Sequence, residues 1–349
     1  MRVTLTGATG LIGSTLVAAL LDDGAEVTVL SRNPERATAR LGVPAVVWDP
    51  LSEPAPTHAL EGRDAVVHLA GENVAQRWSA SAKRAIRESR TIGTRHLVEG
   101  LRACATSAGE AGGGGGGSGR GDRPGGSGSP DEGERPAGGS GGGGQPGGEG
   151  AGGRPAVLVS GSAIGYYGPH GEEPLDEEAP PGGDFLAQVC VAWETEARAA
   201  QKLGIRTVQV RTGVVLDPRG GALAKMLPPF RMGVGGPVAG GGQYVSWIHV
   251  DDLVGLIRAA VNDERWSGPV NGTSPEPVTN RELSHALGRA LHRPALLPVP
   301  GAALGMLYGE MAQIVTTGAR VLPAKPLMLG YEFRHAHLDE ALAAALSTT

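Results

Sequence analysis

The sequence predicts an α/β fold with a doubly wound parallel sheet, and two observations support this prediction. First, short apolar runs alternate with helical runs through the first hundred residues. Second, the apolar runs are continuous, as in "AVVHLA", and do not alternate with polar residues. Continuous apolar strands are typical of parallel sheets that crossover helices cover on both faces. We therefore expect a central sheet between two layers of helices.

Each predicted element follows from its local residue pattern. Apolar and β-branched runs predict strands at 2–6, 26–30, 45–49, 64–70, 155–160 and 206–213. Helical runs cover 11–22, 79–104 and 184–203. A further strand is expected to run into a helix near Asp251, and Thr279 with Glu282 forms a TxxE capping box before a helix that ends near Leu291. The remaining tail predicts a small helical lobe.

A long glycine-rich segment interrupts this pattern. Residues 107–153 hold 24 of the 58 glycines and no Val, Ile, Leu, Met or aromatic residue. Because such a segment cannot bury enough apolar surface to offset the entropy of ordering, we expect a disordered insertion. The predicted organisation is the first half of the sheet domain at 1–106, the insertion at 107–153, the second half at 154–216 and a C-terminal, substrate-side region at 217–349.

Charge and cysteine content exclude several classes of function. The formal net charge is -5, so neither nucleic acid nor an anionic membrane is an expected partner. Cys104 and Cys190 lie far apart without CxxC or Cys/His spacing, so neither a disulfide framework nor a metal site is expected. No apolar run is long enough to span a membrane, and a strand that begins at residue 2 leaves no room for a signal peptide. We expect a soluble cytoplasmic protein of undetermined oligomeric state.

The segment "LTGATGLIG" points to a phosphate-binding loop. Gly7, Gly10 and Gly13 have GxxGxxG spacing between the first predicted strand and the first predicted helix, which begins at Leu11 and Ile12. Glycine permits the tight turn and the close approach of backbone N–H groups to a pyrophosphate, which the helix N-terminus then stabilises. The loop therefore predicts a dinucleotide cofactor, and the alternative is an ordinary glycine-rich turn.

The end of the second predicted strand indicates which dinucleotide binds. An NAD enzyme usually carries an acidic residue there, whereas "VTVLSRNP" ends in Ser31 and Arg32. Arginine pairs with a 2′-phosphate that an acid would repel, so we expect NADP(H). The alternative is an arginine that only faces solvent. Asp49 either contacts the adenine or belongs to a turn, and His68 is expected to be a packed core histidine.

Motifs along the chain resemble a known family. They are "SRNP", "HLAGENVAQRW", "SAIGYYG", "FLAQVCVAWE", "RTGVVL", the block from "GGALAKMLPPF" to "WIHVDDL", "NGTSPEPVTN" and "RP", and they cover almost the whole chain outside the insertion. On these motifs the chain resembles an atypical extended short-chain dehydrogenase/reductase of the NAD-dependent epimerase/dehydratase superfamily. More narrowly, it resembles the epimerase family proteins, also called nucleoside-diphosphate-sugar epimerase-like. The resemblance implies a Rossmann domain, a C-terminal substrate-side lobe and NADP(H).

The resemblance also implies cofactor contacts that the spacing alone does not predict. Leu69 and Ala70 would line the cofactor through their backbone, and Arg90 would reach its phosphates or ribose. Val215 would lie beside the nicotinamide. For Arg90 the alternative is a salt bridge on a helix surface.

The catalytic pair of the superfamily is missing from this chain. In active members a tyrosine acts as general acid/base, and a lysine four residues later lowers its pKa. Alignment on Glu194 places Leu186 and Cys190 at these two positions, and no YxxxK occurs in the chain. Ser162 matches the serine that positions the substrate oxygen. Tyr166, four residues later, is a candidate replacement for the proton donor.

The sequence is compatible with two functions. Besides Tyr166, the candidates for the proton donor or base are Tyr167, the acidic loop 172–178 and, least favoured, the thiol of Cys190. With such a replacement, the protein is an NADP(H)-dependent oxidoreductase or epimerase-like enzyme that acts on an unknown small carbonyl or sugar-nucleotide-like substrate. The alternative is a non-catalytic NADP(H)-binding sensor or scaffold. The retained Ser162 favours the enzyme, and the lost pair favours the alternative.

Overall fold

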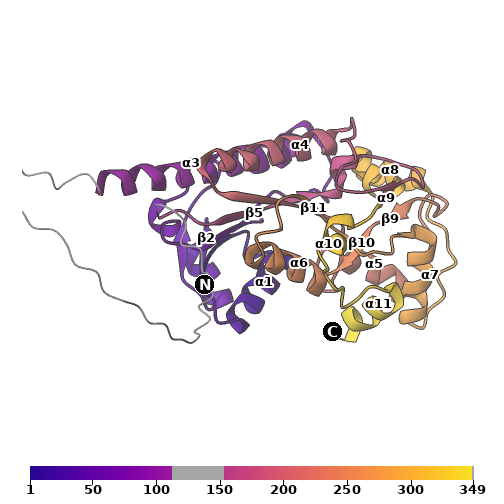
Figure 1. Ribbon diagram of the computed structural model, residues 1–349. Coiled ribbons are helices and arrows are strands. Elements are labelled where there is room, and N and C mark those ends of the chain that lie inside the picture. The colour runs from indigo at the N-terminus through magenta and orange to yellow at the C-terminus, as the bar shows by residue number, and fades with distance from the viewer. Residues whose placement is uncertain (112–152, 348–349) are drawn as a thin grey trace, which may run out of the picture.

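A seven-stranded parallel sheet forms the centre of the computed structural model, which describes residues 1–111 and 153–347 (Figure 1). Its strands are β1 (Arg2–Thr6), β2 (Glu26–Ser31), β3 (Ala45–Val47), β4 (Ala65–His68), β5 (Val157–Ala163), β7 (Arg206–Thr212) and β11 (Gly268–Gly272). Their order is β11-β7-β5-β4-β1-β2-β3, and all neighbouring pairs are parallel. Strand addition changes direction between β1 and β4, and ligands bind outside the carboxyl ends of the strands at such a point. The predicted doubly wound α/β fold is confirmed.

Helices cover both faces of this sheet, as Figure 1 shows. The helices on one face are α1 (Leu11–Asp22), α2 (Pro34–Leu41) and α6 (Val250–Asn262), and those on the other are α3 (Ala80–Ala111) and α4 (Phe185–Arg198). Val67 packs into the core beneath α1 and α6, whereas its neighbour Val66 packs against Leu97 of α3. Because successive residues of a strand point to opposite faces, burial of both faces requires continuously apolar strands.

Several elements end where the sequence pattern did not predict. Helix α3 continues to Ala111, beyond the predicted end at Cys104. The helix predicted over 184–203 ends at Arg198 and continues as a 3₁₀ helix. The predicted disordered insertion lies almost entirely outside the described residues. Where the described chain resumes, the carbonyl of Gly153 accepts a hydrogen bond from the Gly62 amide just before β4, at the end of the sheet opposite its ligand-binding edge.

The sheet extends into the region that the sequence assigned to the C-terminal part. Strand β11 pairs with β7 in parallel and forms one edge of the sheet. The preceding helix α6 contributes Leu253 and Ile257 to the core under the sheet. Residues 217–349 therefore complete the sheet domain as well as forming a separate lobe.

The C-terminal lobe packs short strands and helices beside the carboxyl edge of the sheet (Figure 1). Its elements are β8 (Val214–Leu216), α5 (Gly221–Arg231), β9 (Tyr244–Val245), β10 (Trp247–His249), β12 (Val278–Thr279), α7 (Asn280–Ala290), α8 (Gly301–Tyr308), α9 (Gln313–Thr316), β13 (Arg320–Val321), α10 (Ala324–Met328) and α11 (Leu338–Ser347). Strand β6 (Pro174–Leu175) pairs with β13. The 3₁₀ helices are η1 (Thr57–Ala59), η2 (Ile164–Tyr167), η3 (Ala199–Leu203) and η4 (Gly309–Ala312). The predicted capping box of Thr279 and Glu282 is confirmed at the start of α7.

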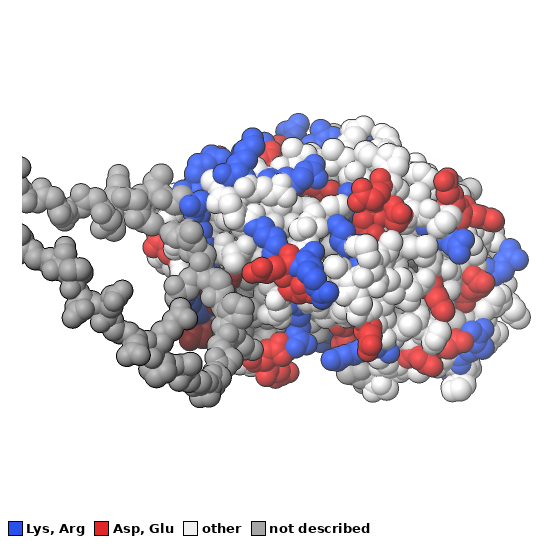
Figure 2. Space-filling view, viewed as in Figure 1, with Lys and Arg blue, Asp and Glu red and all other residues white. Residues whose placement is uncertain are grey.

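The surface carries charges of both signs. Figure 2 shows acidic and basic side chains interspersed on one face, with a group of basic side chains over α3, where Arg84, Arg87, Arg95 and Arg102 are exposed. Within the described ranges, none of the helices combines the length and the hydropathy needed to cross a membrane.

Candidate functional site

The glycine loop after β1 is shaped by contacts that leave no room for a side chain. Gly7 has a φ of +70°, and a Cβ there would lie 2.6 Å from the carbonyl carbon of Leu69 and 2.7 Å from the amide nitrogen of Ala70. A Cβ at Gly13 would overlap the carbonyl oxygen of Gly7. The loop and the end of β4 therefore lie against each other, which brings together the predicted residues Gly7, Leu69 and Ala70.

The start of α1 is available to an anion. The helix begins after Gly10 with no capping side chain and no acidic residue in its first turn. Its first amide groups and the positive end of the helix dipole are thus unneutralised, as a pyrophosphate site requires. The predicted residues Leu11 and Ile12 begin this helix and are half-buried. The cradle fits the diphosphate of a dinucleotide.

Arg32 lies at the same edge of the sheet, immediately after β2. Its side chain is exposed, and it forms no ion pair with another described residue. The Ser31 hydroxyl accepts a hydrogen bond from the Asn33 amide at 3.2 Å. Asp49 accepts hydrogen bonds from the Ser52 hydroxyl and the Leu51 amide, and these bonds, together with the charge of Arg32, lower the pKa of Asp49. Asp49 thus lies in a turn, and its predicted contact with adenine stays a prediction.

Arg90 reaches the same edge from α3. Its guanidinium donates to the carbonyl oxygens of Glu72 at 3.0 Å and Ile86 at 3.1 Å, and lies 5.0 Å from the ring centroid of Trp193. Burial lowers the pKa of Arg90. It forms no ion pair within the described part of the chain, so the structure does not support the alternative of a surface salt bridge. The side chain lies against Gly71, next to the predicted cofactor contacts of Leu69 and Ala70.

Val215 and His68 have different surroundings. Val215 lies in β8, half-buried, and packs with Ile12 and Leu69 against the core below the sheet. His68 is fully buried between the hydroxyls of Thr6 and Thr94, and burial lowers its pKa to about 4. The expectation of a core histidine is confirmed.

A cavity of about 340 Å³ opens beside Arg90, between the sheet edge and the C-terminal lobe. Residues from distant parts of the chain line it. They include Trp78, Arg90, Leu186, Cys190, Val214, Tyr244, Leu283, Gln313 and Ile314. Leu186 and Cys190, which occupy the positions of the missing catalytic pair, thus face the cavity. Burial raises the pKa of Cys190 to about 12, so its thiol stays protonated and unreactive.

The Ser162 hydroxyl is hydrogen-bonded to a buried carboxylate. Its hydroxyl donates to Oε1 of Glu194 at 2.8 Å, and both side chains are buried. The same carboxylate pairs with the guanidinium of Arg211, at 2.8 Å from Nε and 3.0 Å from Nη2. Ser162 is not among the residues that line the cavity. The structure therefore places this hydroxyl in a buried ion-pair network outside the lining of this cavity, and a role of Ser162 toward substrate stays a prediction.

The two tyrosines that follow belong to the same network. The guanidinium of Arg211 lies 3.5 Å from the ring centroid of Tyr166, which is absent from the cavity lining. Tyr167 donates to Asn271 at 2.7 Å and accepts from Arg211 at 3.0 Å, and burial raises its pKa to about 12. In the acidic loop, Glu177 accepts from two backbone amides. The contacts of Tyr167 and Glu177 are those of structural groups.

Sequence reasoning missed residues of the cavity wall that come from the C-terminal lobe. Tyr244, Gln313 and Ile314 lie in stretches that show only glycine-rich turns or a helical tail in the sequence. One signal was available for Tyr244, which lies within the long motif block before "WIHVDDL". No local pattern marks Gln313 or Ile314.

A histidine and aspartate cluster lies outside the cavity lining. Ligand-type atoms of His249, Asp251 and His335 lie within 4.8 Å of one another. However, Nδ1 of His249 already accepts the Asp251 amide as the cap of α6. The positive end of this helix also disfavours a cation. We assign no ion to this cluster, and the absence of a metal site stays a prediction.

A glycine cradle at the point where a parallel sheet reverses its strand order defines a dinucleotide-binding protein of the Rossmann type. The family model described as "NAD dependent epimerase/dehydratase family" matches residues 3–118, and "Domain of unknown function (DUF1731)" matches residues 299–345. An Arabidopsis thaliana protein, "Epimerase family protein SDR39U1 homolog, chloroplastic", is 38% identical over 99% of this chain and 87% of its own length. The Mycobacterium tuberculosis epimerase family protein MT2273 is also 38% identical, over 98% and 97%. The chain belongs to the epimerase family.

Two crystal structures extend this comparison. The structure of human epimerase family protein SDR39U1 (isoform 2) with NADPH covers 100% of both chains, with 29% identity and a TM-score of 0.77. The nucleoside-diphosphate sugar epimerase from Corynebacterium glutamicum is 31% identical, with a TM-score of 0.68, and the match covers 100% of this chain and 58% of that chain. Similarity to both structures covers the whole length of this chain.

Proposed function

We propose that the protein binds NADP(H) along the carboxyl edge of the sheet. The start of α1 would hold the diphosphate, and Arg32 with Ser31 would bind the 2′-phosphate. Leu69, Ala70 and Arg90 would face the part of the cofactor that leads to the cavity. The glycine cradle supports the site, the exposed unpaired Arg32 supports the phosphorylated cofactor, and the human relative was crystallised with NADPH.

We further infer an oxidoreductase that transfers hydride between NADP(H) and a carbonyl compound. The observation that carries this inference is the cavity beside Arg90, because it offers a substrate a walled space next to the proposed cofactor groove. Holding the two reactants together in such a space supplies much of the rate of hydride transfer.

The proton must come from a group other than the missing tyrosine. Tyr244 is the phenol in the cavity wall, and its hydroxyl makes no hydrogen bond to another described residue. We assign proton donation to Tyr244 in preference to Tyr166, whose ring is held against Arg211. Tyr244→Phe should then lower kcat more than Tyr166→Phe, and the reverse order would reinstate Tyr166.

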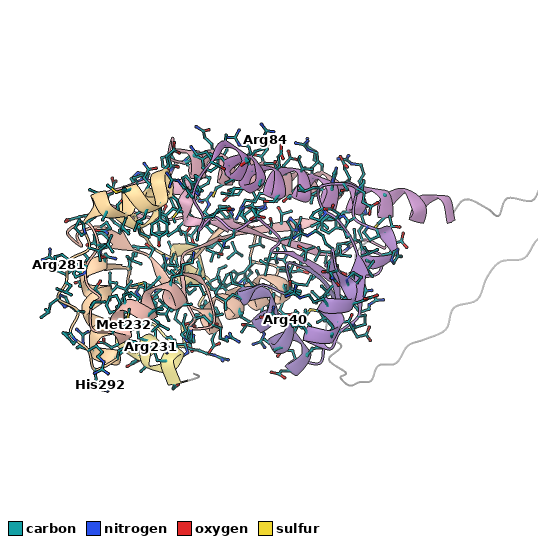
Figure 3. All side chains as sticks on the ribbon, turned by 180° about the vertical axis from the view of Figure 1, so that it is seen from behind. Arg40, Arg84, Arg231, Met232, Arg281 and His292 are labelled. Carbon is teal, nitrogen blue, oxygen red and sulfur yellow. The ribbon has the colours of Figure 1, made fainter. Side chains whose placement is uncertain are left out.

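A cofactor titration tests the first part of the proposal. Arg32→Ala should weaken NADPH binding about tenfold to a hundredfold, because it removes a charge-assisted contact, and should leave NADH binding unchanged. Arg40→Ala is the matched control, since Arg40 is an exposed arginine in the last turn of α2 (Figure 3). Equal affinities of the unaltered protein for NADPH and NADH would contradict the 2′-phosphate assignment.

A non-catalytic NADP(H)-binding protein is the second candidate. The specific observation in its favour is that Leu186 and the unreactive Cys190 face the cavity where catalytic groups would stand. A screen of carbonyl and sugar-nucleotide compounds for NADPH oxidation separates the two. Turnover lost in Tyr244→Phe establishes the enzyme, whereas NADPH binding without any turnover favours the sensor or scaffold.

A further inference from the structure

We propose that the cavity binds an uncharged, mainly apolar carbonyl compound and excludes nucleoside diphosphate sugars. This inference rests on the proposed function, since it treats the cavity as the substrate side of an NADP(H) site. The first observation is charge. Among the described residues that line the cavity, only Arg90 and Asp184 are charged, so a single cation faces the space.

One nitrogen of that single cation, Nη1, is already engaged. Arg90 donates to two backbone carbonyls and lies beside the proposed cofactor groove. Other cations lie near the wall without lining the cavity, among them Lys83, which pairs with Glu310 and lies 6.0 Å from the ring centroid of Trp78. Lys225 donates to the carbonyl of Ala75 at 3.0 Å, and Arg320 lies 5.6 Å from the ring centroid of Tyr244. Moving a diphosphate out of water into the cavity incurs a large desolvation cost when no group of opposite charge pairs with it.

Two of the helix starts that reach the cavity, those of α4 and α7, are closed to a diphosphate. The start of α4 is occupied by the carboxylate of Asp184, which accepts the Ala187 amide at 2.8 Å. The start of α7 is closed by the capping box of Thr279 and Glu282. The start of α5 is uncapped, has no acidic residue in its first turn and reaches the cavity through Ala222, but it lies against Leu11 at the start of α1, beside the proposed cofactor groove. Acidic or capped helix starts repel phosphate, because they cancel the dipole and use the free amides.

Most polar groups of the wall are satisfied by the protein itself. The Ser246 hydroxyl donates to the Ala319 carbonyl, and the Thr317 hydroxyl donates to the Gln313 carbonyl, each at 2.7 Å. The Tyr244 hydroxyl, the Gln313 side-chain amide and Nδ2 of Asn280 have no hydrogen-bond partner in the described part of the chain. Three free side-chain groups can serve one carbonyl oxygen, whereas most of the hydroxyls of a nucleoside diphosphate sugar would be left without partners.

The remaining wall is apolar and continues to the mouth of the cavity. It is formed by side chains such as Trp78, Leu186, Val189, Met226 and Leu283. Ile314 and Val315 also line the cavity while 39% and 41% exposed, so apolar surface reaches from its interior to solvent. An apolar ligand body would cover this surface, and burial of each methylene group favours binding.

Ligand binding to the NADPH-loaded full chain tests the proposal. Calorimetric titration with methyl ketones from butanone to octanone should show affinity rising up to about fourfold for each added methylene, as long as the chain stays within the apolar wall. UDP-glucose should neither bind nor compete. Competition by UDP-glucose, or an affinity that does not depend on chain length, would overturn the proposal.

A pair of matched variants locates the binding. Ile314→Asp places a charge at the mouth of the cavity and should weaken octanone binding at least tenfold. Met232→Asp changes a 70% exposed apolar residue of the C-terminal lobe that does not line the cavity, and should leave binding unchanged (Figure 3). Both variants should bind NADPH like the unaltered protein. An equal loss of octanone binding in both variants, or no loss in either of them, would also overturn the proposal.

The same experiments separate this inference from the proposed function. Failure to bind NADPH at all contradicts the proposed cofactor site. Intact NADPH binding together with preference for UDP-glucose contradicts only the apolar substrate class. Ketone binding with NADPH bound but no turnover keeps the substrate class and contradicts the oxidoreductase.

Discussion

Replacing Ser162 with alanine tests whether this hydroxyl stabilises the fold or serves chemistry. In the structure it donates to the carboxylate of Glu194 at 2.8 Å, and the exposed fractions are 5% for Ser162 and 0% for Glu194. A buried hydrogen bond to a charged group contributes about 1.5–3 kcal/mol. Glu194 keeps its two bonds to Arg211 in the variant, so its charge is not left unpaired. We therefore expect Ser162→Ala to lower the free energy of unfolding by about 2 kcal/mol.

Urea unfolding followed by circular dichroism measures this loss, and Ser160→Ala is the matched control. Ser160 is equally buried on β5, but its hydroxyl donates to a neutral carbonyl, that of Gly161. Its loss should cost about 1 kcal/mol or less. In a double-mutant cycle, Ser162→Ala should cost less when Glu194→Gln is already present, with a coupling energy of about 1 kcal/mol. A Ser162→Ala protein that is as stable as the unaltered chain, yet has lost turnover, would refute the structural role.

Three further predictions concern the cradle, the core and the missing pair. Gly7→Ala should weaken NADPH binding at least tenfold, because the added Cβ would displace Leu69. Gly24→Ala is the control, since Gly24 also has a positive φ, +75°, but has open space around it. This control should cost only about 1 kcal/mol of stability and leave the affinity for NADPH unchanged. His68 has its pKa lowered to about 4, so its contribution to stability is complete above about pH 6.5 and falls by about 2 kcal/mol by pH 5. Urea unfolding at pH 6.5 and at pH 5 should show this loss in the unaltered protein and not in His68→Gln. An equal change of the unfolding free energy with pH in both proteins would contradict this prediction. Cys190→Lys should destabilise the fold by several kcal/mol in thermal unfolding, because it buries a second cation near Arg90, while Cys190→Ala should cost less. A Cys190→Lys protein of unaltered stability would show that the site accepts the lysine that active members of the superfamily carry.

Local features of the cofactor site are readable from the sequence because they form within a few residues. The turn of Gly7, Gly10 and Gly13, the helix that follows it and the capping box of Thr279 depend on backbone conformation and on hydrogen bonds between near neighbours. Arg32 is equally readable, since its place after β2 follows from the strand pattern alone. The sheet is predictable for the same reason, because continuous apolar runs permit burial on both faces.

Only the tertiary structure decided which residues line the proposed substrate cavity. In the sequence Ser162 resembles the serine that positions the substrate oxygen in the superfamily. In the structure its hydroxyl donates to Glu194, 32 residues away, within a buried network. The cavity wall joins Trp78, Leu186, Tyr244 and Ile314 from four separate segments. Strand β11 was also missed, because a short run with two glycines becomes a strand only by pairing with β7. By itself the sequence determined that a dinucleotide loop is present and that the usual pair is absent. Which groups face the substrate depends on long-range packing, which no local pattern encodes.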